Sequence, residues 1–251
     1  MPLRAKTATL LVLLALVAPA AALEPGFSPG EQIDFSVEYL SIRTAEARIT
    51  VGRPEGPVWP VICQLRTDGI AKFLDIREHL VAYWDTDAHL TRGSDLSAIE
   101  VGDRHVDTAR YDHEMGKATI KIQRRGRTSI DTYPIPGDVQ DIAGAVLWLR
   151  LQPLEDAGRY EIPVFSTQRI FTLRADVVSR ERIETPAGTF ETVKVQVQTG
   201  FEGNFSTKRD TFVWFSDDSR HVPVRLSAEF AVGSLVATVT AYRPGGELAR
   251  R

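Results

Sequence analysis

The sequence has one cysteine, Cys63, so an internal disulfide bond is excluded. In an oxidising compartment a lone thiol is usually buried, because an accessible one would be modified. Cys63 falls in the apolar run 58–65, and the sequence shows no histidine or cation placed to activate it. We therefore interpret Cys63 as a small core residue and not as a catalytic nucleophile.

Metal-binding motifs are also missing. The histidines are His79, His89, His105, His113 and His221. They form no His-x-His or His-Glu-x-x-His pair, which is the close spacing that zinc sites use. Segment 85–89 alternates oxygen-bearing side chains as a calcium loop does, but Leu90 occupies the position that needs glycine. We interpret 85–89 and the pair Asp217-Asp218 as turns, and we expect neither a metal nor a cofactor.

Signatures of catalysis are missing as well. The chain has no Gly-x-Ser-x-Gly elbow and no phosphate-binding loop. Paired carboxylates could still act on a polymer, because the fold and not the sequence spacing brings such pairs together. None of the 33 acidic residues stands in a distinctive setting. The sequence therefore nominates no catalytic residue, leaves the ligand-binding residues unknown and favours a protein that is not an enzyme.

The charge balance gives no reason to expect a nucleic-acid partner. The 30 basic residues are outnumbered by 33 acidic ones, for a net charge of −3. Nucleic-acid binding depends on neutralising phosphates, which an acidic surface opposes. One local exception is the basic segment 124–127, which we interpret as a solvated hairpin end, with contact to anionic lipid headgroups as the alternative.

A long apolar run occurs only at the N-terminus. Arg4 and Lys6 precede the apolar stretch 8–18, and the small residues 20–22 then offer a cleavage site before Leu23. This layout predicts a secretory signal peptide over residues 1–22 and a periplasmic protein. The apolar stretch is roughly half the ~20 residues that span a bilayer, and no cysteine follows for lipid attachment. We therefore expect no membrane span.

The rest of the chain is dominated by strands. Apolar and polar residues alternate in several segments, and the apolar faces include Ile33, Phe35, Val37, Ala118, Ile120, Ile122, Val193, Val195 and Val197. Strands with one apolar and one polar face are typical of antiparallel sheets with one face on a core. Turn signals at 113–116, 124–127, 185–189, 216–219 and 232–234 separate them. About a dozen strands then predict an all-β antiparallel meander curled into a barrel-like roll or half-barrel.

One segment, 141–151, lacks this alternation. Asp141 is a good N-cap, and Pro153 follows the apolar run. We predict a single helix of about 11 residues, apolar on nearly every face and therefore buried inside the curved sheet, with Trp148 in the core. We expect one domain over residues 29–244 and a disordered tail over 245–251.

Several strings resemble the bacterial family called Domain of Unknown Function 3108. They are GEQIDFSVEY at 30–39, DIAGAVLWLR at 141–150, IPVF at 162–165, TPAGTFETVKV at 185–195 and FVWFSDDSRHVPVRLSAEFAVGSLVATVTAY at 212–242. The chain departs from the family at 41–45, where a glycine-rich turn is usual. The resemblance implies an exported antiparallel β roll and carries no activity, so no functional residue is transferred.

Three functions remain open. The sequence favours an exported, non-catalytic binding or accessory protein of the cell envelope, with an apolar or lipid-like ligand held on the curved sheet. The alternatives are a hydrolase or lyase that acts on an envelope polymer through acidic residues, and a structural protein that docks an envelope partner. The oligomeric state and the identity of the ligand or substrate stay undetermined.

Overall fold

The alternating segments form fourteen strands in a computed structural model that describes residues 26–166, 168–198, 211–229 and 233–246. The strands are β1 (Gln32–Tyr39), β2 (Ile42–Val51), β3 (Val58–Thr67), β4 (Arg77–Asp85), β5 (Leu90–Glu100), β6 (Asp103–Asp112), β7 (Lys117–Arg124), β8 (Arg127–Pro134), β9 (Arg159–Ser166), β10 (Arg169–Thr185), β11 (Gly188–Gln198), β12 (Thr211–Ser216), β13 (Pro223–Glu229) and β14 (Ser234–Arg243). A short 3₁₀ helix, η1 (Gly69–Leu74), and one α-helix, α1 (Ile142–Leu151), complete the described elements. The expected signal peptide, 1–22, lies outside the described residues.

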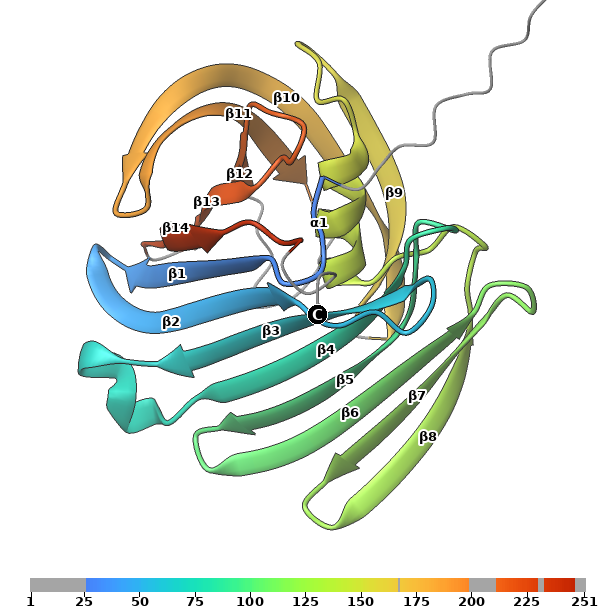
Figure 1. Cartoon of the computed structure of the whole chain (residues 1–251). Coiled ribbons are helices and arrows are strands. Elements are labelled where there is room, and N and C mark those ends of the chain that lie inside the picture. The colour runs from blue at the N-terminus through green and yellow to red at the C-terminus, as the bar shows by residue number, and fades with distance from the viewer. Residues whose placement is uncertain (1–25, 167, 199–210, 230–232, 247–251) are drawn as a thin grey trace, which may run out of the picture.

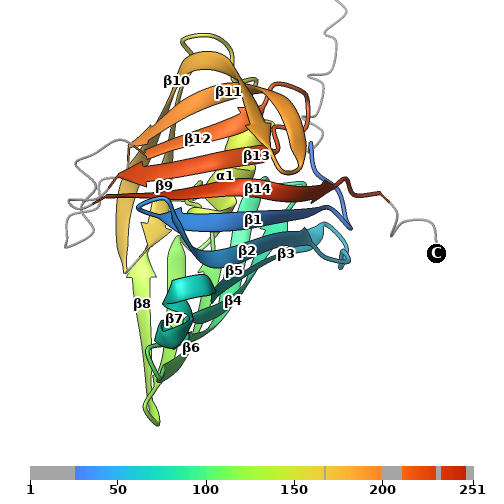
Figure 2. The same cartoon turned by 90° about the vertical axis from the view of Figure 1, so that its left-hand side faces the viewer.

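All fourteen strands belong to one antiparallel sheet, in which β8 and β9 are the two edges. Each half is a meander, and the halves meet where β1 pairs with β14. The sheet curls around α1, and β10 and β11 arch over the helix while β3 to β8 extend away from it (Figures 1 and 2). The predicted all-β roll is confirmed. It has fourteen strands where about a dozen were expected, and it is open because the edge strands β8 and β9 do not pair with each other.

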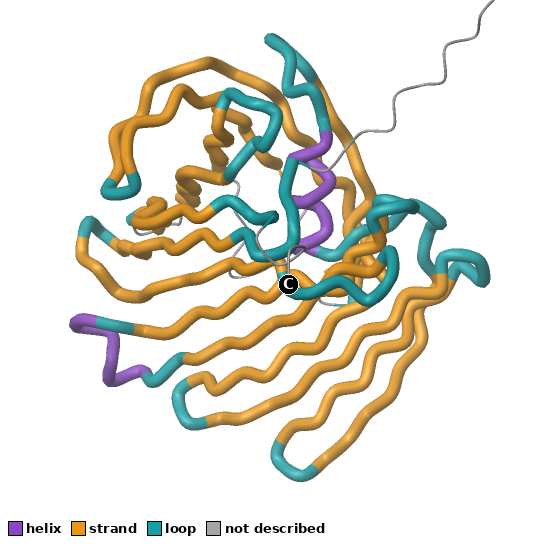
Figure 3. The backbone as a smooth tube through the Cα atoms, viewed as in Figure 1, coloured by secondary structure: helices purple, strands orange, loops and turns teal. Residues whose placement is uncertain are grey.

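The strands place their connections at two opposite ends. One end carries the turns between β1 and β2 (40–41), β5 and β6 (101–102), and β7 and β8 (125–126), together with the η1 connection (68–76). We call this end of the sheet the tip edge. The other end carries the connections β2–β3, β4–β5 and β6–β7, and the segment that leads into α1. In Figure 3 the two helical segments lie at these opposite ends.

The predicted helix is confirmed, with Asp141 as its N-cap. Its carboxylate Oδ1 accepts a hydrogen bond from the Gly144 amide over 2.6 Å. Ala145 and Leu149 pack into the core of β9 to β12, whereas Leu147 and Leu151 pack against β3 and β4. These two stripes, each spaced i to i+4, explain why the helix is apolar on more than one face. Trp148 is partly buried and packs against both groups.

A buried polar network fixes the start of α1. The side-chain Oε1 of Gln140 accepts from the Thr91 amide (3.0 Å) and hydroxyl (2.9 Å), and its Nε2 donates to the His89 carbonyl (2.8 Å). A Cβ at Gly144 would lie 1.8 Å from the Thr91 hydroxyl. Glycine is therefore required in this helix by the close approach of β5.

The predicted turns at 113–116, 124–127, 185–189 and 216–219 all join consecutive strands. The turn of the first hairpin contains no glycine. Leu40 and Ser41 form it with φ values of 53° and 62°, a left-handed conformation that costs energy for residues with a Cβ. The chain therefore keeps a tight turn here at a conformational cost.

Among the described residues, no helix combines the length and the apolar character needed to cross a membrane.

Candidate functional site

The helix covers only part of the concave face of the sheet. Cys63 packs in the same core cluster as Leu147 of α1, so this face of β3 looks toward the helix. Directly opposite Cys63 on β4 is Leu80, and Leu96 follows on β5. Because directly opposed residues in a ladder share a face, this row continues the helix-facing surface away from α1.

Two rows of residues make up this uncovered surface, which we call the floor. The first row, nearer the tip edge, runs Leu65, Glu78, Ala98, His105, and the second runs Leu80, Leu96, Asp107, Ile122. The floor therefore crosses β3 to β7 and combines aliphatic side chains with three titratable ones.

The aliphatic side chains of the floor are Leu65, Leu80, Leu96 and Ile122, and all are partly exposed. They lie outside the four core clusters formed by the described residues. One row closer to α1, Val61 and Ala82 are only 2% and 1% exposed. Burial thus falls off beyond the helix, and it leaves partly exposed aliphatic side chains on the helix-facing side of the curled sheet.

Glu78, His105 and Asp107 form the polar part of the floor. Glu78 and His105 flank Ala98, whose small side chain lets groups on β4 and β6 approach each other. Burial raises the pKa of Glu78, and the charge of Glu100 adds to this while His105 opposes it. Burial also raises the pKa of Asp107, again opposed by His105.

Two polar atoms of this group, His105 Nδ1 and Asp107 Oδ1, are buried without a hydrogen-bond partner among the described residues. Leaving such atoms unpaired is costly in a folded protein, so water, an ion or a bound molecule satisfies them. The floor therefore offers apolar contact together with unused hydrogen-bonding capacity.

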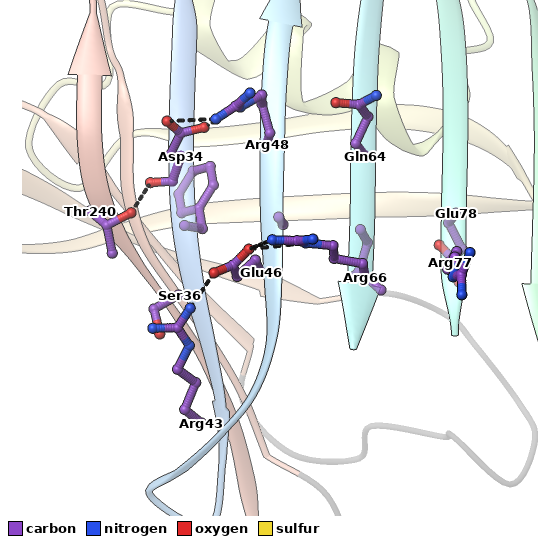
Figure 4. Close-up of a pocket in the computed structure, with 13 residues that line it drawn as sticks. Asp34, Ser36, Arg43, Glu46, Arg48, Gln64, Arg66, Arg77, Glu78 and Thr240 are labelled. Atoms are coloured by element: carbon purple, nitrogen blue, oxygen red, sulfur yellow. Dashed lines mark hydrogen bonds and ion pairs between the residues drawn. The ribbon is translucent and has the colours of Figure 1, made fainter. Parts of the chain in front are cut away.

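A second hollow, of about 620 Å³, lies over β1 to β4, where outward-facing charged side chains line it together with two residues of the floor, Leu65 and Glu78. Figure 4 shows its charged side chains in rows across the strands, where they pair with one another. Arg48 pairs with Asp34, and Arg66 contacts Glu46 over 2.7 Å. Because its lining is charged, with Asp34 and Glu46 held in ion pairs by arginines, this hollow is a poor site for an apolar ligand.

A third hollow, of about 570 Å³, lies at the tip edge between the β5–β6 and β7–β8 turns. Its lining is strongly basic and includes Arg104, Arg124, Arg125 and Arg127. The acidic side chain in the lining is Asp103, which pairs with Arg124 and Arg125. This hollow contains the whole basic segment 124–127.

The residues considered from the sequence are widely separated in the structure. Asp85 accepts hydrogen bonds from the Asp87 and Ala88 amides and pairs with Arg92, which accounts for the calcium-like segment as a turn. Burial raises the pKa of Cys63 to about 12, as expected for an unreactive thiol. Among the described residues, no three metal-binding side chains converge.

Sequence reasoning missed Glu78, His105 and Asp107. They come from two strands that are not neighbours, so no local spacing joins them. The local signal pointed elsewhere, because the apolar residue here is Val106, which is 36% exposed and lies on the other face from His105. That signal gains meaning only when the register is known.

The fold and floor together define an open antiparallel β roll with a helix against one end of its concave face. The chain belongs to the family described as "Protein of unknown function (DUF3108)", whose model matches residues 34–240. The predicted family is confirmed. No curated protein matches the chain.

Solved structures share the fold at low sequence identity. A β-barrel-like protein of Domain of Unknown Function DUF1849 from Brucella abortus is 9% identical, with a TM-score of 0.59 over 86% of this chain and 97% of that one. A protein with a YmcC-like fold from Bacteroides fragilis is 12% identical, with a TM-score of 0.33 over 87% of this chain and 97% of that one. The first likeness supports a barrel-like fold, and the second is too loose to support any argument.

Proposed function

We propose that this protein is an exported, non-catalytic carrier that binds the apolar part of an amphipathic envelope molecule on the floor. The observation that carries the proposal is the row of partly exposed aliphatic side chains on the helix-facing surface. A soluble protein gains stability by burying such a surface, so an exposed concave one indicates a ligand.

The dimensions of the floor suit a chain-like apolar group. The row Leu80, Leu96, Asp107, Ile122 crosses four strands and spans about 14 Å at the usual strand spacing, with one carboxyl group among its aliphatic side chains. Burying this surface under an acyl chain yields about 25 cal/mol for each Å² of apolar area removed from water. That gain supports binding without any covalent step.

The polar group of the floor orients the ligand. A carboxyl group with a raised pKa is protonated over a wider range, so Glu78 and Asp107 can donate as well as accept a hydrogen bond. His105 Nδ1 supplies a further unpaired polar atom. A few placed polar groups beside a large apolar area are the usual composition of a small-molecule site.

Export is part of the proposal and rests on the N-terminal sequence. Residues 1–22 have the layout of a cleavable signal, with Ala22 before the expected cut. Amphipathic molecules of the envelope must cross water between membranes, and a carrier in the periplasm would shield their apolar part. The expected mature N-terminus is Leu23, which intact mass spectrometry of the exported form measures directly.

The binding test uses a fatty acid that carries a polarity-sensitive fluorophore. We expect saturable binding by the exported form, weakened by at least about tenfold in Leu96→Asp, because a charge on the floor opposes the apolar ligand. Ser97→Asp is the matched control, since Ser97 is the next residue of β5, is exposed and faces outward. Equal loss in both variants, or no binding by the wild type, would contradict the proposal.

The carboxyl groups also support a second candidate, an enzyme acting on an envelope polymer. Two carboxyls with raised pKa beside a histidine are a feature of some hydrolytic sites. The two candidates separate in the double variant Glu78→Gln and Asp107→Asn. If the protein is an enzyme, the wild type turns over isolated envelope polymers and the double variant does not, whereas a carrier shows no turnover in either form.

A further inference from the structure

The tip edge carries large apolar side chains that are about half to more than four-fifths exposed. Phe73 and Val101 are 83% and 71% exposed, and Ile70, Leu40 and Ile42 are also exposed. They come from three separate connections, namely the η1 segment, the β5–β6 turn and the β1–β2 turn. In Figure 2 these connections and the β7–β8 turn follow one another along one side of the sheet. The opposite end differs. Among the β2–β3, β4–β5 and β6–β7 connections there, Met115 is the large apolar residue that is exposed.

Backbone strain accompanies two of these side chains. Leu40 and Val101 occupy hairpin turns with φ values of 53° and 51°. Glycine and asparagine are preferred in this conformation, and a β-branched residue such as valine is disfavoured there. Large apolar residues thus occupy positions where they cost both solvation and conformational energy, which indicates a role outside the folded chain itself.

Positive charge surrounds the same residues. Segments 40–43, 68–77, 100–104 and 124–127 contain seven arginines and lysines against four acidic residues. The corresponding segments of the other end, 52–57, 85–90, 112–117 and 135–141, contain two against seven. Strands β1 to β8 therefore run from a basic end to an acidic end within a chain whose net charge is −3.

Several of the basic groups are free to meet an external anion. Lys72, Arg104 and Arg127 make no ion pair with any described residue. Arg104 and Arg127 line the 570 Å³ hollow. Arg125 lies in the β7–β8 turn, also lines the hollow, and has a side chain that is 78% exposed. Guanidinium groups in such a hollow match the oxygens of a phosphate group.

We propose that the tip edge docks on the surface of an anionic phospholipid bilayer. Phe73, Ile70 and Val101 enter the interfacial region, while the arginines of the β7–β8 turn meet headgroup phosphates in the basic hollow. Apolar side chains among basic ones are the composition that favours an interfacial position, and each Arg or Lys near an anionic surface adds to binding. The acidic opposite end disfavours the reversed orientation by repulsion.

This orientation is distinct from ligand binding but places the floor near the membrane. Glu78 lies two residues after Ile76, the last residue of the η1 connection, and His105 lies three residues after Gly102 of the β5–β6 turn. The floor therefore begins within a few residues of the docked edge. A molecule that leaves the bilayer would meet the floor without first crossing the acidic end.

Vesicle flotation with the exported form tests the docking. We expect binding to vesicles of phosphatidylglycerol mixed with phosphatidylcholine, little binding to pure phosphatidylcholine, and weaker binding at high salt. The double variants Phe73→Asp with Val101→Asp and Arg125→Glu with Arg127→Glu should each lower the partition coefficient by at least about tenfold. All four positions are exposed, so circular dichroism should show an unchanged fold.

Matched controls come from the opposite end. Met115→Asp and Arg53→Glu make the same kinds of change at exposed sites there and should stay within about twofold of the wild type. Equal loss in controls and tip variants, or no preference for anionic vesicles, would overturn the proposal. Displacement by inorganic phosphate with no effect of Phe73→Asp would indicate a small-anion site and would also overturn it. Leu96→Asp should keep vesicle binding, so failure of the carrier function and failure of docking give different results.

Discussion

Arg150 of α1 and Glu31, which precedes β1, form a two-pronged ion pair in which both side chains are only 2% exposed. The distances are 2.8 Å from Nη1 to Oε2 and 2.9 Å from Nη2 to Oε1. Arg150 also donates through Nε and Nη2 to the Arg220 carbonyl (3.1 and 3.0 Å), and the Tyr242 hydroxyl contacts Glu31 (3.2 Å). The end of α1 is thus joined to both β1 and the β12–β13 turn, which lie far apart in the sequence.

Removing one partner of this pair should be strongly destabilising. Arg150→Met leaves the Glu31 carboxylate buried without its cation, which costs about 3 to 5 kcal/mol of the free energy of unfolding. The double variant Glu31→Leu with Arg150→Met should recover much of that loss, because neither charge then remains buried. Urea unfolding at pH 7 measures both. The exposed pair Arg174 and Glu161 is the control, since its loss should cost at most about 1 kcal/mol. A single variant as stable as the wild type would contradict this account.

Gly144→Ala should destabilise the protein, which is the reverse of the usual effect in a helix. Alanine is ordinarily favoured over glycine by about 1 kcal/mol in a helix interior. Here the added Cβ would lie 1.8 Å from the Thr91 hydroxyl and 2.6 Å from Gln140 Oε1, so the network that holds α1 must shift. We expect a net loss of about 1 to 3 kcal/mol by urea unfolding.

The double variant Gly144→Ala with Thr91→Ala separates the causes. It removes the clashing hydroxyl, so it should be more stable than the sum of the two single changes predicts. Strict additivity would show that the Thr91 contact is not the source of the cost.

The helix and most strands could be predicted from the sequence because their signals are local. The N-cap of Asp141 and the unbroken apolar run after it need no knowledge of the rest of the fold. Period-two alternation likewise marked β1, β7 and β11 within their own residues.

Strand partners and the floor could not be predicted in this way. Pairing of β1 with β14 joins Ile33 to Tyr242, and nothing in either segment specifies the other. The polar floor group depends on the register of β4, β5 and β6, where a shift of one residue would turn Glu78 outward. The β1–β2 turn could not be predicted either, because its two residues, Leu40 and Ser41, are not of the types that usually adopt a positive φ.

Asp141 should make the stability of the protein depend on pH between about 4 and 6. Burial raises the pKa of this N-cap carboxyl to about 6 in the folded state, despite the stabilising hydrogen bonds from the Gly144 amide and the Thr91 hydroxyl. In the unfolded chain the pKa is near 4, so the folded state binds the proton more tightly. The free energy of unfolding contributed by this group is therefore highest below pH 4 and falls as the pH rises to about 6, by on the order of 3 kcal/mol.

Asp141→Asn isolates this contribution. Asparagine is as good an N-cap as aspartate and does not titrate, so the helix keeps its first hydrogen bond. Other carboxyls, such as Asp85 and Asp95, have lowered pKa values and produce the opposite trend, but they do so equally in both proteins. The difference in the free energy of unfolding between variant and wild type should therefore increase in favour of the variant from pH 4 to pH 6 and then level off. Urea unfolding at intervals of one pH unit measures this difference. A difference that is constant across the range would show that Asp141 ionises in the folded protein as easily as it does in the unfolded chain.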